Sequence, residues 1–137
     1  MSALAEALVA AQLELPTAIP RDSQGAGYRY TSLDKLIEAT RPILNAHGLS
    51  ITQAPSFVIV GDTLRPVLTT SLHCGDEEAH FETPLYVTDQ TMQGLGAAIT
   101  YARRYAWAAA LGIASEEDTD AATYNPDDVP FGEGSYS

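Results

Sequence analysis

The sequence predicts an α+β domain in which a three-stranded antiparallel sheet is packed by helices, and two observations support this fold class. Hydrophobic residues recur at helical spacing in two segments before residue 48, alternate with polar residues over about forty positions, and return to helical spacing over residues 91–111. The dipeptides Gly61-Asp62 and Gly75-Asp76 divide the alternating region into three strands. We therefore expect a β-β-β-α core preceded by N-terminal helices.

Two helices are expected before the sheet. Residues 2–13 carry an apolar stripe, and prolines follow it, so the first helix ends before them. Thr31 or Ser32 can cap a second helix that ends at Gly48. Residues 21–27, between these helices, are polar and rich in glycine, so we expect no regular structure there.

The strands and a long helix follow in order. Pro66 and Pro84 fall within the strand region, and because they lack an N–H donor they belong at a sheet edge or a bulge. An alanine-rich helix is expected over residues 91–111, and Gly112 ends it. The expected strand segments are residues 49–53 with 56–60, 64–73 and 78–87.

Charge is distributed unevenly along the chain. Seven Lys and Arg against eighteen Asp and Glu give 7 − 18 = −11 for the 137 residues, a balance that would repel a polyanion if it were evenly spread. The tail, residues 116–137, holds 0 − 7 = −7, and residues 1–115 hold 7 − 11 = −4. We therefore expect a folded domain over residues 1–115, followed by a flexible acidic tail.

Cysteine content and the N-terminal sequence indicate where the protein acts. A single cysteine, Cys74, excludes a disulfide framework and favours a reducing compartment. The N-terminus has no basic segment, and no apolar run approaches the length of a membrane span. We expect a cytoplasmic protein that does not associate with membranes.

The strongest candidate site lies on the long C-terminal helix. On a helix, Tyr101 and Arg104 share one side, and Arg103 lies about 100° around the axis. Two guanidinium groups flanked by Tyr101 and Tyr105 can hold phosphates and offer ring faces to bases. Gln93 lies in the first turn, where backbone amides can also contact a phosphate. The alternative is that the small residues of this helix pack on the sheet and the arginines pair with acids.

A second candidate is Tyr28-Arg29-Tyr30. In a strand, Tyr28 and Tyr30 lie on one face and Arg29 on the other. They form either a stacking platform or a half-buried packing unit.

Nothing in the sequence requires catalysis or a cofactor. The sequence lacks a Walker loop, a nucleophile elbow and an HExxH motif. The sequence does not predict a metal site, because its candidate ligands are only two histidines and one cysteine in the strand region: His73, Cys74 and His80. We therefore expect a non-catalytic protein without a cofactor or a metal.

Over roughly residues 5–121, the chain resembles the ERF family, the essential recombination function single-strand annealing proteins of bacteriophages and prophages. The resemblance is carried first by Thr100-Tyr101-Ala102-Arg103-Arg104-Tyr105, which Gly112-Ile113-Ala114 and the acidic cluster Glu117-Asp118-Thr119-Asp120 follow. Tyr28-Arg29-Tyr30 and the helix up to Gly48-Leu49 add to it. The family is related to the RecT and Redβ annealing recombinases, with which it is thought to share a β-β-β-α core.

The resemblance implies an ATP-independent protein that binds single-stranded DNA, assembles into rings or helical arcs, and anneals complementary strands during phage recombination in a bacterial host. Alternatives are a protein that only protects single-stranded DNA, and an oligomeric interaction protein that recruits partners through its acidic tail. Arg103 and Arg104 are the first phosphate contacts that we predict. Further predicted DNA contacts are Tyr101, Arg29, Lys35, Gln93, Tyr28, Tyr30 and Tyr105.

The tail carries a second, shorter resemblance. Asp127-Asp128-Val129-Pro130-Phe131 is similar to the acidic tip of bacterial single-stranded DNA-binding protein, which recruits repair partners. In that protein the phenylalanine is the last residue, whereas here Gly132 to Ser137 follow it. Asp127, Asp128, Pro130 and Phe131 are thus candidates for binding host replication or repair proteins. A chance match, or a tail that folds back on the arginine face, are the alternatives.

Overall fold

The computed structural model describes residues 1–116. It confirms an α+β fold with a three-stranded antiparallel sheet of strand order β3-β4-β5. The helices are α1 (Ala3–Glu14), α2 (Leu33–Ala46) and α3 (Met92–Leu111). The strands are β1 (Ser23–Gly25), β2 (Tyr28–Tyr30), β3 (Leu49–Val60), β4 (Thr63–Cys74) and β5 (Glu77–Pro84). Asp127, Asp128, Pro130 and Phe131 lie outside the described residues.

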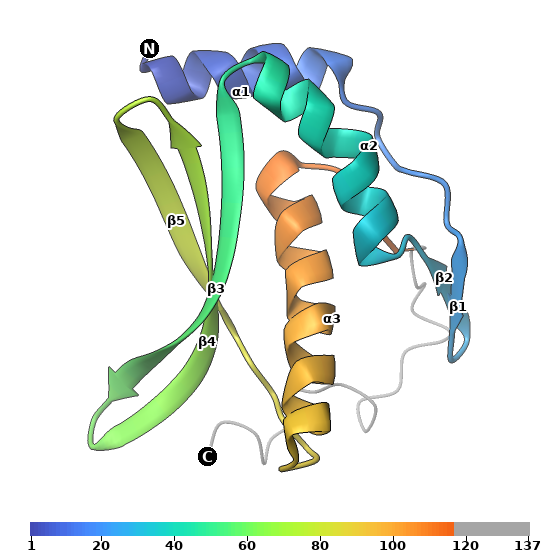
Figure 1. Cartoon of the computed structure of the whole chain (residues 1–137), viewed down its shortest axis with the longest axis vertical. Coiled ribbons are helices and arrows are strands. Elements are labelled where there is room, and N and C mark those ends of the chain that lie inside the picture. The colour runs from blue at the N-terminus through green and yellow to red at the C-terminus, as the bar shows by residue number, and fades with distance from the viewer. Residues whose placement is uncertain (117–137) are drawn as a thin grey trace, which may run out of the picture.

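The sheet extends further at one end than at the other. Strands β3 and β4 pair along their whole length, but β5 pairs only with Val67–Cys74 of β4. The remaining end of the β3–β4 hairpin bends away from the helices at the lower left of Figure 1. Pro66 lies in this part of β4, and its carbonyl accepts a hydrogen bond from the Leu85 amide at 3.0 Å. The nitrogen of Pro66 points to the same edge of β4, beyond the last paired residue of β5. No strand there needs a hydrogen bond from it, so the missing N–H costs nothing.

Helix α3 is the central element of the molecule. It packs along one face of the sheet, with α2 on its other side and α1 across one end (Figure 1). Ala102 and Ala106 are buried against Leu68 of β4, and such small side chains allow a close approach of helix and strand. Thr91 begins the helix by accepting a hydrogen bond from the Gly94 amide, and Gly112 ends it in a left-handed conformation.

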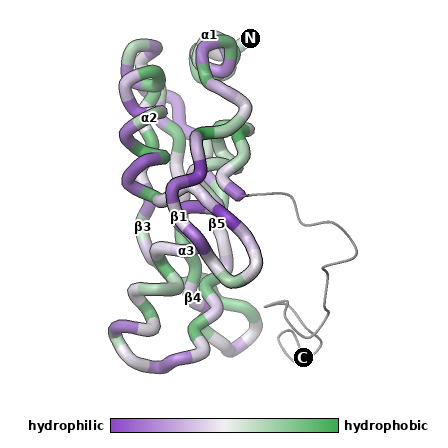
Figure 2. Tube along the Cα trace, turned by 90° about the vertical axis from the view of Figure 1, so that its right-hand side faces the viewer, coloured by the Kyte–Doolittle hydropathy of each residue, from purple (hydrophilic) through white to green (hydrophobic). Residues whose placement is uncertain are grey.

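Helix α2 is amphipathic, and hydrophilic and hydrophobic residues alternate along it in Figure 2. Leu36 and Leu44 on its inner face are buried in the main core. The buried Trp107 of α3 donates its indole N–H to the Thr40 hydroxyl at 2.9 Å, and that hydroxyl donates to the Leu36 carbonyl at 2.8 Å. This chain of hydrogen bonds holds α2 on α3 without leaving a buried polar group unpaired.

The connector between α1 and α2 is more regular than the sequence predicts. Ser23–Gly25 forms strand β1, which pairs with β2 in an antiparallel hairpin. Gly25 lies directly under the ring of Tyr28 in this hairpin, and a Cβ there would force that ring to move. The glycine that suggested an irregular segment instead makes room for an aromatic side chain across the hairpin.

Residues 113–116 form a C-terminal strap that crosses the start of the chain. The Ala114 amide donates to the Thr17 carbonyl at 2.8 Å, and the Thr31 amide donates to the Ser115 carbonyl at 2.8 Å. A β-bridge joins Glu116 to Tyr30 of strand β2. The strap therefore packs on the rest of the domain as far as Glu116, the last residue that the structure describes.

Candidate functional site

The candidate site is a cluster of four tyrosines, three of which contact one guanidinium group. Strand β2 supplies Tyr28 and Tyr30, and helix α3 supplies Tyr101 and Tyr105. The guanidinium carbon of Arg104 lies 4.1 Å from the ring centroid of Tyr30, 5.0 Å from that of Tyr101 and 5.7 Å from that of Tyr105. These are cation–π distances, so the arginine holds rings from two separate elements around one positive charge.

The four rings form two tilted pairs. The ring centroids of Tyr101 and Tyr105 are 4.8 Å apart, and those of Tyr28 and Tyr30 are 5.8 Å apart. Burial raises the pKa of the Tyr105 phenol far above its ordinary value, as does its hydrogen bond with Tyr101. Burial also raises the pKa of Tyr28. A tyrosine is neutral at physiological pH even at its ordinary pKa of about 10, so these shifts reflect the packing of the cluster and not a change in its charge.

Arg104 itself is buried and paired. Its side chain is 7% exposed, and its Nε donates to Oε1 of Glu116 at 2.8 Å. The Glu116 carbonyl also accepts a hydrogen bond from the Arg21 guanidinium at 2.8 Å. In this structure Arg104 is therefore occupied by a carboxylate rather than open to a phosphate. The stretch around Arg104 contains no acid in the sequence, but the strap brings one to it from beyond the end of the helix.

Arg103 lies on a different side of α3, at the seam with strand β3. Its Nε donates to Oε1 of Gln53 at 3.3 Å, and the Gln53 amide nitrogen donates to the Arg103 carbonyl at 3.1 Å. The side chain is half-buried, and within residues 1–116 it forms no ion pair with a carboxylate. A guanidinium held in place by a neutral amide keeps its full charge for an anion.

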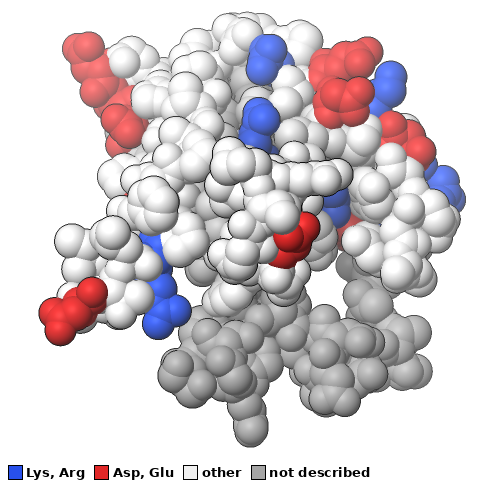
Figure 3. Space-filling model, turned by 60° about the horizontal axis from the view of Figure 1, so that its bottom comes forward, with Lys and Arg blue, Asp and Glu red and all other residues white. Residues whose placement is uncertain are grey.

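Two other predicted cations lie outside the tyrosine cluster. Arg29 is exposed on the face of β2 opposite to the tyrosines, and it donates to the Arg21 carbonyl at 2.8 Å. Lys35 is exposed on α2 and lies 3.6 Å from a carboxylate oxygen of Glu38. On the face shown in Figure 3, Lys and Arg are scattered among Asp and Glu rather than gathered into one basic patch.

The start of α3 offers less to a phosphate than we predicted. Gln93 is exposed in the first turn of the helix. However, the Gly94 amide already donates to the Thr91 hydroxyl at 3.0 Å, and the Leu95 amide donates to the Thr91 carbonyl at 2.9 Å. The capping residue therefore occupies two of the amides that were expected to be available.

Three residues that complete the site were not predicted from the sequence: Gln53, Arg21 and Glu116. Each contacts a residue that is distant in the chain, and nothing in the local pattern distinguishes Arg21 or Glu116. A polar residue at an inward position of a strand is the one signal that could have identified Gln53, which pairs with the buried Thr70 of β4.

The remaining sequence candidates do not assemble into another site. His73 contacts the Thr52 hydroxyl at 2.9 Å, whereas His80 lies near Glu78 and Glu82 on its own strand. Within residues 1–116 no three His, Cys, Asp or Glu side chains gather so as to hold a metal ion. No helix in this part of the chain is long and apolar enough to span a membrane.

Comparison with known proteins gives one clear match. Residues 4–128 match the family model of the ERF superfamily, which confirms the resemblance carried by the Tyr101 to Tyr105 segment. Neither a curated protein nor a solved structure matches the chain significantly.

Proposed function

We propose, from the premise that this chain belongs to the ERF superfamily, that it binds single-stranded DNA and anneals complementary strands without ATP. Recombination and single-strand annealing are the activities associated with this family. The proposed setting is phage recombination in the cytoplasm of a bacterial host.

The observation that supports this proposal most strongly is the exposed side of the tyrosine cluster. Tyr101 and Tyr105 are 44% and 40% exposed, although most of the cluster around them is packed. Aromatic rings that are fixed on a helix and partly exposed to solvent can stack on bases of any sequence. A protein that pairs arbitrary complementary strands needs such sequence-tolerant contacts, because base edges must stay free for pairing.

Arg103 supplies the phosphate contact in this proposal. It lies on the same helix as the two exposed tyrosines but about 160° around the axis from each, so phosphate and bases contact different sides of α3 in this proposal. Gln53 orients its guanidinium. Arg104 acts indirectly, by holding the rings of Tyr30, Tyr101 and Tyr105 in place. In this proposal Arg103 therefore binds phosphate, and Arg104 positions the tyrosine rings.

A single protomer has few cations for a polyanion, since residues 1–115 carry a net charge of 7 − 11 = −4. We propose that protomers assemble into a ring or helical arc, which repeats the weak patch of each protomer along the DNA. Binding then depends strongly on assembly and on salt concentration.

The test combines an annealing assay with salt-dependent binding. Two complementary fluorescent strands are mixed with the full chain in the absence of ATP, and the rate of pairing is followed. Arg103→Gln should slow annealing and reduce the slope of log affinity against log salt by about 0.7 for each lost phosphate contact. Arg41→Gln, which removes the same charge from an exposed position on α2, is the matched control.

Each alternative function has a distinct result in these assays. Salt-dependent binding without faster annealing would indicate a protein that only protects single-stranded DNA. Absence of DNA binding at low and high salt would indicate an oligomeric interaction protein instead. Equal salt slopes for Arg103→Gln and the native chain would contradict the assignment of Arg103.

A further inference from the structure

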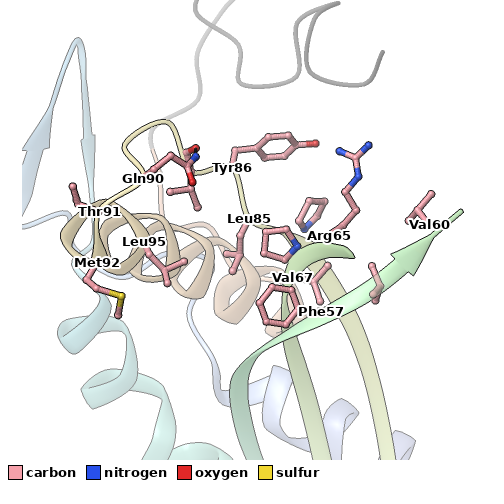
Figure 4. Close-up of a pocket in the computed structure, with 14 residues that line it drawn as sticks. Phe57, Val60, Arg65, Val67, Leu85, Tyr86, Gln90, Thr91, Met92 and Leu95 are labelled. Carbon is pink, nitrogen blue, oxygen red and sulfur yellow. Dashed lines mark hydrogen bonds between the residues drawn. The ribbon is translucent and has the colours of Figure 1, made fainter. Parts of the chain in front are cut away.

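An apolar groove lies at the opposite end of α3 from the strap. It has a volume of about 820 Å³ and is formed by the projecting end of the β3–β4 hairpin, the segment after β5 and the first turn of α3. Figure 4 shows Phe57 and Val67 on the strand side, with Leu95 and Met92 on the helix side. Phe57 and Met92 are 65% and 81% exposed, so both would lose contact with water if the groove were filled.

We propose that this groove binds the segment Val129-Pro130-Phe131 of the same chain. This places the acidic tail on the hairpin and the first turn of α3, and not on the tyrosine cluster. The proposal does not depend on DNA binding.

The first argument is chemical fit. Residues 117–137 are mostly polar or acidic, and Val129, Pro130 and Phe131 are their longest run of bulky apolar side chains. The groove presents valines, leucines, prolines and a phenylalanine. Binding of this apolar run in the groove is favourable because apolar surface of both the run and the groove is removed from water.

The second argument is charge. Arg65 is the only charged residue among the described residues that line the groove. It is exposed, and it forms no ion pair with a carboxylate within residues 1–116. The apolar run follows directly after Asp127 and Asp128. When the run occupies the groove, two carboxylates therefore come within reach of the one guanidinium at its wall.

The third argument is reach. Glu116 is fixed to Arg104, and Leu95 lies nine positions before Arg104 on the same helix, which is about 14 Å along the axis. Crossing to the other side of the helix adds about 10 Å. The chain from Glu116 to Asp127 can span about 36 Å when extended. The tail is thus long enough to reach the groove of its own protomer without strain.

The test uses Met92 as a reporter inside the groove. The sequence has only two methionines, and the other one, Met1, is at the N-terminus. In the full chain with methyl-labelled methionine, the ring of Phe131 should shift the Met92 methyl resonance. Val129→Ser/Phe131→Ser should abolish that shift and leave the Met1 signal unchanged. Tyr136→Ser, which removes an aromatic residue of the tail outside the apolar run, should leave both signals unchanged.

Two results would overturn the proposal. An identical Met92 signal in the native chain and in Val129→Ser/Phe131→Ser would show that the segment does not occupy the groove. In a second sample, labelled Val129→Ser/Phe131→Ser is mixed with unlabelled native chain. Recovery of the native Met92 shift there would show that the occupant is the tail of another copy. Unchanged fluorescence of the buried Trp107 verifies that every variant is folded.

Discussion

Arg104, which is buried, and Glu116, which is partly buried, form an ion pair that joins the middle of α3 to the C-terminal strap, with Nε and Oε1 2.8 Å apart. The guanidinium also lies against the ring of Tyr30, so one side chain connects a helix, a hairpin and the strap. Such a pair contributes little net stability compared with an apolar pair, but it is costly to break because the remaining charge stays buried. Its role is therefore to position the tyrosines.

Breaking this ion pair should destabilise the fold. Arg104→Met leaves the Glu116 carboxylate without its partner, and we expect a loss of about 3 kcal/mol in the free energy of unfolding, measured by urea denaturation. The double variant Arg104→Met/Glu116→Met should recover much of that loss, because it leaves no unpaired charge. A midpoint for Arg104→Met equal to that of the native chain would show that the pair is not maintained in solution.

Loss of a stacking ring and loss of a phosphate contact should have different effects on the salt dependence of DNA binding. We expect Tyr101→Ala to weaken binding of single-stranded DNA by about 1–3 kcal/mol for each base that stacks on its ring. The salt slope should remain that of the native chain, because no cation is removed. Tyr101→Phe keeps the ring and should retain most of the affinity. If Tyr101→Ala binds as tightly as the native chain, the cluster is not the stacking surface.

Gly94 and Gly96 should respond in opposite ways to the same substitution. A Cβ at Gly94 would collide with the Asp89 carbonyl oxygen, whereas one at Gly96 meets nothing within 4 Å. Gly94→Ala should therefore lower the melting temperature, because the loop before α3 must shift. Gly96→Ala should raise stability by up to about 1 kcal/mol through helix propensity. Thermal unfolding of the two variants tests both expectations, and equal shifts would contradict them.

Acid should weaken the attachment of α1 to the sheet. The backbone amides of Leu4 and Ala3 donate to the Glu77 carboxylate at 3.1 and 3.2 Å, which lowers the pKa of Glu77 below its ordinary value of 4.5. This stabilisation is fully present above pH 4.5 and is lost as the pH falls through the lower, folded value.

Glu77→Gln tests this dependence. The variant should unfold at lower urea than the native chain at pH 7, and the two midpoints should converge as the solution is acidified below pH 4.5. Glu78→Gln, which removes the neighbouring carboxylate beside His80, is the control and should not show this convergence. A constant difference between Glu77→Gln and the native chain at all pH values would contradict the role of the carboxylate.

Much of the secondary structure could be predicted because it depends on local patterns. The alternation over residues 49–87 and the glycine turns indicate the antiparallel sheet, and Gly112 marks the end of α3. The hairpin at Ser23–Gly25 was missed because its glycines favour irregular structure when the ring of Tyr28 is not considered. The hairpin includes a contact across the turn, between Gly25 and the ring of Tyr28, and such a contact is not part of local propensity.

The sequence by itself determined the order of the three helices and of the three strands of the main sheet, the family, and the alternation that places Tyr28 and Tyr30 on one face. Only the tertiary structure decided which arginine is available. Arg103 and Arg104 are adjacent in sequence, but a rotation of about 100° directs one to an amide on β3 and the other to a carboxylate on the strap. The cost of burying a charge depends on the segment that packs against it, and that segment can come from anywhere in the chain.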